Sequence, residues 1–227
     1  MPFQLTDVVP WGRTFDEYRE MFALTPADLA RRILGCSDGP AAFNATATSK
    51  GTQVVSVDPL YQFTPAQIRA RVEATAETVA EQTRLNAQEF VWSTIPSVDA
   101  LLRLRLSAMH AFLADFQAGR GEGRYLCGSL PDLPFADHSF DLALCSHFLF
   151  LYSARHDLAF HLRAIAELSR VAREVRVFPL LELGSKPSRH LDAVMRALPA
   201  YGLEAERVTV PYEFQRGGNE MLRVTRA

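Results

Sequence analysis

The chain has 227 residues, of which 48% are hydrophobic and 22% charged, and its formal net charge is −2. This composition argues against a disordered chain and suits a single large α/β domain over residues 1–227. The small negative charge argues against a nucleic-acid partner, which usually requires a basic face.

Two helices and a βαβ unit are predicted at the start of the chain. Aromatic and apolar residues at helical spacing predict a helix over 11–24, and Thr25 is a suitable N-cap for a short second helix. The run 33–34, which ends in glycine, predicts a strand, and a helix over 41–48 and a β-branched strand over 54–57 follow it. These two strands should be parallel, joined by a right-handed crossover.

Longer helices are predicted next, over 65–86 and 98–116, with Arg103 and Arg105 on the solvent side of the second. The remaining pattern predicts helices over 156–172 and 188–201 and strands at 125–127, 140–145, 175–178, 205–210 and 220–225. This order describes an α/β fold. We expect a doubly wound Rossmann-like sheet, mostly parallel with an antiparallel last strand, and extra N-terminal and mid-chain helices.

The three cysteines, Cys36, Cys127 and Cys145, have no CxxC spacing, so they predict neither a disulfide framework nor a metal site. We expect all three to be small buried hydrophobes. No apolar run approaches the roughly 18 residues of a membrane span, and the N-terminal residues have no signal-peptide pattern. The expectation is a cytoplasmic protein with no membrane partner; the sequence leaves its oligomeric state open.

Candidate ligand-binding groups follow the first two strands. Open parallel sheets bind ligands beyond the carboxyl ends of their strands. The loop 35–40 after the first strand contains two glycines, and Gly39 lies near a helix start with free N–H groups. Asp58 ends the second strand, and its carboxylate suits the two hydroxyls of a ribose. The two features together favour a nucleotide-like cofactor, although Asp58-Pro59 is also a helix-start signal.

At these positions the sequence resembles the class I S-adenosylmethionine-dependent methyltransferases. The resemblance extends from about Ile33 to Arg226, with its motifs in the right order on the expected elements. The matching segments are Leu34-Gly35-Cys36-Ser37-Asp38-Gly39, Val55-Ser56-Val57-Asp58, Gly128-Ser129-Leu130-Pro131-Asp132-Leu133-Pro134-Phe135 and Asp137-His138-Ser139-Phe140-Asp141-Leu142-Ala143-Leu144.

The resemblance implies a cofactor, S-adenosyl-L-methionine, and a role for each matching residue. It assigns the methionine part of the cofactor to the glycine loop, the ribose to Asp58, the adenine to Ser129 and Leu130, and the methyl-transfer cleft to Ser146 and His147. The implied cofactor-binding residues are Gly35, Cys36, Ser37, Asp38, Gly39, Asp58, Ser129, Leu130 and Ser146. No metal site is expected.

His147 has two interpretations as a residue of the cleft. An imidazole titrates near neutral pH and is suited to act as a general base for a substrate hydroxyl, which makes His147 the candidate catalytic residue. Alternatively, it lines the cleft or packs in the apolar run Phe148-Leu149-Phe150-Leu151. A base is often dispensable for methyl transfer, because positioning of the nucleophile supplies much of the rate.

Aromatic residues are the candidate substrate contacts. Many relatives in the family cover the cofactor with an N-terminal helix, which implies a lid over residues 1–30; otherwise Trp11, Phe15 and Tyr18 form an ordinary amphipathic helix. Arg216 would suit a planar or acidic substrate, although loop packing explains it equally. The predicted substrate-lining residues are Trp11, Tyr18, Tyr61, Tyr152, Tyr212 and Arg216.

The predicted function is in-line methyl transfer to an unidentified small molecule. The Asn/Asp-Pro-Pro-Tyr signature of amino-group methylation is absent after the fourth strand, and Ser146-His147-Phe148 stands there instead. Three positions depart from the family pattern: Ile33, Ser37 and Ser129. They motivate a second hypothesis, a methyltransferase-fold binding protein without catalysis. A nicotinamide-dependent dehydrogenase is a third, disfavoured because the loop lacks G-x-G-x-x-G.

Overall fold

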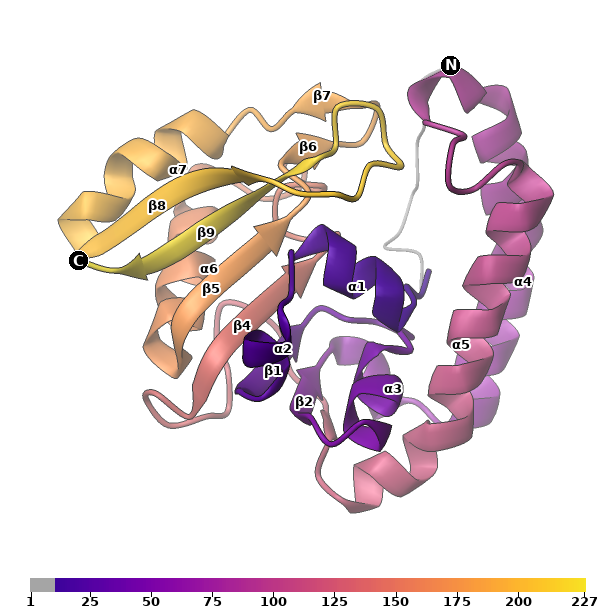
Figure 1. Ribbon diagram of the computed structural model, residues 1–227, viewed down its shortest axis with the longest axis horizontal. Helices are drawn as coiled ribbons and strands as arrows, with labels where there is room; N and C mark the ends of the chain where they lie inside the picture. The colour runs from indigo at the N-terminus through magenta and orange to yellow at the C-terminus, as the bar shows by residue number, and fades with distance from the viewer. Residues whose placement is uncertain (1–10) are drawn as a thin grey trace.

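A seven-stranded sheet forms the centre of the structure, a computed structural model in which residues 11–227 are described (Figure 1). The strand order is β3-β2-β1-β4-β5-β9-β8. The first five strands in this order are parallel, and β9 is antiparallel to both of its neighbours. The predicted fold class is therefore confirmed. Strand order reverses between β1 and β4, which is where such sheets bind ligands.

The helices and strands alternate through most of the chain. The strands are β1 (Arg32–Cys36), β2 (Gln53–Val57), β3 (Tyr125–Leu126), β4 (Phe140–Ser146), β5 (Ala172–Phe178), β6 (Leu181–Glu182), β7 (Lys186–Pro187), β8 (Leu203–Thr209) and β9 (Glu220–Arg226). The α-helices are α1 (Phe15–Met21), α2 (Pro26–Leu29), α3 (Phe43–Ser49), α4 (Pro65–Leu85), α5 (Val98–Gly121), α6 (Leu158–Val171) and α7 (Leu191–Ala197), and the 3₁₀ helices are η1 (Pro59–Gln62), η2 (Ala87–Glu89) and η3 (Leu198–Tyr201).

Apolar side chains on both faces of the sheet explain why helices cover it on both sides. On one face, Leu34, Ala143 and Val175 pack with residues of α6 and α7, such as Ile165 and Val194. The opposite face is covered by α1 and α3. Near-continuous apolar strands are the expected pattern for a parallel sheet buried on both faces.

Helices α4 and α5 form a hairpin at one edge of the molecule, with α3 and the β2 side of the sheet as their neighbours (Figure 1). Aromatic rings hold the hairpin to the sheet: Tyr61 contacts Phe112 and Phe116, and all three contact Tyr125 of β3. At the other end of the hairpin, Val91 donates a 2.8 Å backbone hydrogen bond to Phe214. The mid-chain helices therefore make one wall over the carboxyl ends of the strands.

Two predictions about burial are wrong. Arg105 was expected to face solvent, but its side chain is buried, because it continues the apolar face that Leu101 and Met109 begin at a spacing of four residues. Its predicted companion Arg103 is exposed, as expected. Cys127 was expected to be buried like Cys36 and is instead exposed, since it lies in the loop beyond the end of β3.

Local sequence signals explain where several elements begin and end. The first helix starts at Phe15 because Thr14 is its N-cap and forms a capping box with Glu17. The predicted helix over 188–201 is divided into α7 and η3 at Pro199, which has no N–H to donate. Within the described residues, none of the helices combines the length and apolarity that a membrane crossing requires.

Candidate functional site

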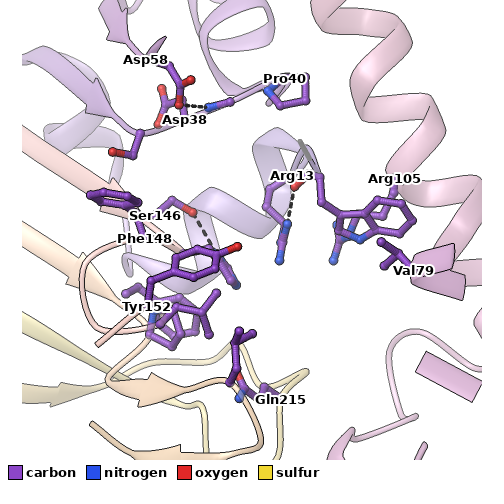
Figure 2. A pocket seen from close by; sticks show the side chains of 18 of the residues that line it. Arg13, Asp38, Pro40, Asp58, Val79, Arg105, Ser146, Phe148, Tyr152 and Gln215 are labelled. Carbon is purple, nitrogen blue, oxygen red and sulfur yellow. Dashed lines mark hydrogen bonds between the residues drawn. The ribbon is translucent and has the colours of Figure 1, made fainter. Parts of the chain in front are cut away.

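A cavity of about 430 Å³ opens beyond the carboxyl ends of β1, β2 and β4 (Figure 2). Its lining combines residues of the glycine loop, the ends of β2 and β4, the α4–α5 hairpin and the loop 212–218. The volume lies within the range of roughly 300–1,000 Å³ that is typical of small-molecule and cofactor sites. The cavity also lies at the β1–β4 reversal, where a doubly wound sheet binds its ligand.

The glycine loop is shaped around a buried carboxylate, Asp38. Its two oxygens accept hydrogen bonds from the hydroxyls of Tyr18 (2.8 Å) and Ser56 (2.6 Å). Burial, with a smaller contribution from the charge of Asp58, raises the pKa of Asp38 to about 6. Ser37 has a φ of 59°, in the left-handed region, so the chain turns sharply at the end of β1. Tyr18 thus supports the loop from α1.

Gly35 leaves the space that Asp38 occupies. A Cβ atom at position 35 would lie 1.8 Å from Oδ2 of Asp38, which is itself held by Ser56. We expect Gly35→Ala to lower the free energy of unfolding by about 1–3 kcal/mol, the usual cost of overpacking. Gly121→Ala is the matched control, because a Cβ atom there meets no atom within 4 Å. Urea unfolding of both variants tests this; equal stability would contradict it.

Asp58 is the N-cap of η1 and lines the cavity at the end of β2. Its Oδ2 accepts a 2.9 Å hydrogen bond from the Gly39 N–H, and its Oδ1 accepts a 2.7 Å bond from the Leu60 N–H. Both interpretations of Asp58-Pro59 therefore apply, since Asp58 caps η1 and lines the cavity. Each carboxylate oxygen has a second lone pair, so the group can accept further hydrogen bonds. Burial raises the pKa of Asp58 to about 6.

Ser146 and His147 line the cavity where β4 ends. The Ser146 hydroxyl lies 2.9 Å from Nδ1 of His147, and the His147 ring packs edge-on against Phe178. A φ of 52° at His147 turns the chain into the next loop. Burial, together with the charges of Arg13 and Arg105, lowers the pKa of His147 well below 6.5. The imidazole is therefore neutral at pH 7, and the same surroundings make it a weak base.

Two arginines that line the cavity, Arg13 and Arg105, lie near one buried carboxylate, Glu17. The Glu17 Oε2 accepts a 2.6 Å hydrogen bond from Nη1 of Arg105, and its Oε1 accepts a 2.9 Å bond from the Tyr212 hydroxyl. Arg13 lies just before α1, and its Nη1 donates to the Trp11 carbonyl. Although burial opposes the ionisation of Glu17, Arg105 and Arg13 lower its pKa to about 2. This cluster carries a net charge of +1.

The cavity brings together most of the predicted site residues. Those that line it are Trp11, Ser37, Asp38, Gly39, Asp58, Ser129, Ser146, His147, Tyr152 and Tyr212. The others lie around it: Gly35, Cys36 and Leu130 belong to the strand and core behind the loop, and Tyr18 and Tyr61 are buried supports. Tyr61 donates a 2.8 Å hydrogen bond to the Gly39 carbonyl. Arg216 is outside the cavity, where it donates to the Gln88 and Phe90 carbonyls.

The predicted N-terminal lid is described only in part, because residues 1–10 lie outside the described residues. Of its aromatic residues, Trp11 lines the cavity, whereas Phe15 and Tyr18 stack on Phe43 in the core. Sequence reasoning missed Arg13, Arg105 and Glu17. One signal for Arg105 is present in the sequence, since a lone arginine interrupts the apolar face of α5.

Comparisons with known proteins identify a matching family and a full-length relative. A family described as a methyltransferase domain matches residues 105–175. An uncharacterized protein of Methanocaldococcus jannaschii, MJ0045, is 31% identical over 223 residues, which cover 98% of each chain.

Two solved methyltransferases are also similar in structure. Mitomycin 7-O-methyltransferase MmcR has a TM-score of 0.48 at 14% identity, covering 94% of this chain and 54% of its own. Magnesium protoporphyrin IX methyltransferase (ChlM) from Synechocystis PCC 6803 has a TM-score of 0.47 at 10% identity, covering 94% of this chain and 91% of its own. The chain thus spans about half the length of MmcR.

Proposed function

The chain belongs to the class I S-adenosylmethionine-dependent methyltransferases, and we propose that it binds S-adenosyl-L-methionine and transfers the methyl group to a small molecule. The observation that carries this proposal is the position of Asp58. Its carboxylate lines the cavity beside the glycine loop, at the end of the strand next to β1. A carboxylate at this point of a doubly wound sheet suits a ribose diol.

The residues of the cavity fit such a cofactor. Asp58 would hold the ribose, the turn at Ser37–Gly39 would face the methionine part, and Ser129 would border the adenine. When bound, the cofactor supplies a methyl group activated by a sulfonium. The free second lone pairs of the Asp58 oxygens give the site capacity for hydrogen bonds that the protein itself does not use.

The protein's own contribution to the reaction would be positioning and exclusion of water. Apolar side chains, among them Phe148, Leu151 and Phe178, line much of the cavity and would hold the acceptor in one orientation. His147 is neutral and lines the same space, so it would orient an acceptor hydroxyl or amine by hydrogen bonding, while its lowered pKa makes it a weak general base. Ser146, at 2.9 Å from Nδ1, would fix the orientation of the ring.

Two measurements test the proposal. Calorimetric titration with S-adenosylmethionine and S-adenosylhomocysteine tests cofactor binding. Mass spectrometry tests the reaction, by detecting the S-adenosylhomocysteine formed when the protein is incubated with S-adenosylmethionine and a panel of small aromatic acids, phenols and amines. The proposal expects 1:1 binding of both compounds and turnover with at least one acceptor. No binding of either compound at millimolar concentration would overturn it. Binding without turnover across the panel would favour the non-catalytic hypothesis.

The affinity for S-adenosylhomocysteine should fall as the pH is lowered. Asp58 has a pKa of about 6, raised by burial, and its protonated form would lose part of its capacity to accept hydrogen bonds. If binding requires the carboxylate, the affinity at pH 5 should be about tenfold lower than at pH 7.5. Calorimetry at the two pH values tests this. In Asp58→Asn, the affinities at pH 5 and pH 7.5 should be nearly equal, because the side chain no longer titrates. Equal affinity at both values would contradict the assignment of Asp58.

A further inference from the structure

Arg105 is a buried arginine whose hydrogen bonds are incomplete. Its side chain is 1% exposed, and among the described residues only Glu17 is bonded to it, through Nη1. Within residues 11–227, no hydrogen-bond partner contacts its Nε or its Nη2. Unpartnered buried donors are rare in folded proteins, because each carries a desolvation cost that no hydrogen bond offsets, and the cost is larger for a charged group.

A second buried arginine of this fold has no unpartnered nitrogen, so burial alone does not explain the open donors of Arg105. Arg176 of β5 is also buried, and all three of its nitrogens are bonded. Its partners are Glu174, the Phe22 carbonyl and Asp28. Arg176 lies in the protein interior, whereas Arg105 lines the cavity. The open donors of Arg105 therefore belong to a residue of the cavity wall.

The open edge of Arg105 has a definite chemical complement. Nε and Nη2 lie on one side of the planar guanidinium and present parallel N–H groups. This edge matches the two oxygens of a carboxylate, which it binds in a bidentate manner. Arg13 adds a second positive charge, and within the described residues its Nε also has no partner. Because Glu17 neutralises only one of the two guanidiniums, the cluster retains one positive charge for an anion.

The position of Arg105 separates it from the residues assigned to the cofactor. It comes from α5, beside Val79 of α4, whereas Asp38 and Asp58 come from the loops after β1 and β2. In the view of Figure 2, Arg13 lies between these two groups. Arg13 is also joined to the start of α3, which follows the glycine loop, since its carbonyl accepts a hydrogen bond from the Ala42 N–H. Arg105 thus belongs to the wall that would face the acceptor.

We propose that Arg105, assisted by the charge of Arg13, binds a carboxylate of the methyl acceptor, so that the substrate is a small organic acid with an apolar body. The apolar body would contact the cavity wall formed by Phe148, Leu151 and Phe178. The inference rests on the proposed function only in naming the bound molecule as the acceptor. It also moves acid recognition from Arg216, whose guanidinium is outside the cavity, to Arg105.

Benzoate and its neutral analogue benzamide are suitable probes, titrated by NMR against the free protein and against the protein saturated with S-adenosylhomocysteine. In the saturated protein, S-adenosylhomocysteine already occupies the groups that hold the cofactor's own carboxylate, so benzoate cannot bind to them. We expect benzoate to bind both forms and benzamide to bind at least fivefold more weakly. Similar binding of the two probes would overturn the proposal.

Arg105→Lys keeps the charge and the pairing with Glu17 but removes the planar fork. It should weaken benzoate binding at least fivefold and leave the affinity for S-adenosylhomocysteine unchanged. Arg103→Lys, at an exposed position of the same helix, is the matched control and should change neither. If the first variant fails to fold, Glu17→Gln/Arg105→Met removes the charged pair together; it should reduce the preference for benzoate over benzamide, and the charge of Arg13 should account for what remains.

Two results would contradict the assignment of the carboxylate to the acceptor. One is unchanged benzoate affinity in Arg105→Lys. The other is competition between benzoate and S-adenosylhomocysteine for the wild-type protein, together with a loss of S-adenosylhomocysteine affinity in Arg105→Lys. That result would mean that Arg105 holds the carboxylate of the cofactor. If the wild-type protein fails to bind S-adenosylhomocysteine, the proposed function fails, and the benzoate titration of the free protein still decides whether the anion site exists.

Discussion

Replacing Glu17 by glutamine should destabilise the protein by about 3–5 kcal/mol, the range seen when one partner of a buried ion pair is removed. The substitution hardly changes the volume of the side chain, but it leaves the guanidiniums of Arg13 and Arg105 without an anion. In the wild-type protein, Oε2 of Glu17 is 2.6 Å from Nη1 of Arg105, and Oε1 of Glu17 accepts a hydrogen bond from the Tyr212 hydroxyl. The effect should therefore come from charge and not from packing.

Thermal unfolding measures this effect. For a chain of this size a change of 1 kcal/mol corresponds to roughly 2–4 °C, so the midpoint should fall by roughly 10 °C. Glu20→Gln is the control, since Glu20 is exposed on the same helix. The double variant Glu17→Gln/Arg105→Met should recover part of the loss, because it removes both members of the pair. A midpoint unchanged in Glu17→Gln would contradict the electrostatic account of this wall.

Acid should act on the same pair in a defined pH window. Arg105 and Arg13 lower the pKa of Glu17 from its ordinary 4.5 to about 2, against the opposing effect of burial. A carboxyl whose pKa is depressed in the folded state stabilises that state fully above its unfolded value. The contribution of Glu17 is therefore present above about pH 4.5 and is lost as the pH falls towards about 2.

The second large effect is expected at Asp58. Asp58→Asn should weaken binding of S-adenosylhomocysteine by about 2–3 kcal/mol, or roughly 30- to 150-fold, because hydrogen bonds to a charged acceptor are the strong ones. An asparagine Oδ1 can still accept from the Leu60 N–H, which keeps the cap of η1. The loss should therefore appear in ligand affinity and leave the fold intact.

Asp16→Asn is the matched control for this experiment, because Asp16 is on the surface with a side chain 81% exposed. Calorimetry should show that Asp16→Asn binds S-adenosylhomocysteine with the wild-type affinity. Far-ultraviolet circular dichroism of Asp58→Asn should match that of the wild type. If Asp58→Asn binds S-adenosylhomocysteine as tightly as the wild-type protein, the ribose is not held by Asp58 and the orientation proposed for the cofactor is wrong.

Local patterns in the sequence predicted the sheet and one side of the cavity. The strand at β4 could be predicted because it contains the continuous apolar run 142–145, and Asp58 because an acidic residue ends an apolar strand beside a glycine loop. Such signals depend on neighbours in the chain. The handedness of βαβ units limits the possible strand orders, but the structure is needed to show that β4 pairs with β1 and not with β3.

The charged wall of the cavity could not be predicted in the same way. Arg105 pairs with Glu17, which is 88 positions away in the chain, and only the folded arrangement of α1 and α5 brings them together. An arginine on a helix is usually solvent-exposed, so assigning Arg105 to the outer face followed the general tendency. Arg13 lies in a loop before α1, where no periodic pattern indicates which side chain turns inward.

A crystal structure of the protein with S-adenosylhomocysteine tests the central claim most directly. The account predicts that the ribose hydroxyls lie within hydrogen-bond distance of the Asp58 carboxylate and that the adenine lies beside Ser129. It also predicts that the sulfur faces the space between His147 and Arg105. A ligand bound elsewhere, or a ribose turned away from Asp58, would contradict the assignment of this cavity as a methyltransferase site.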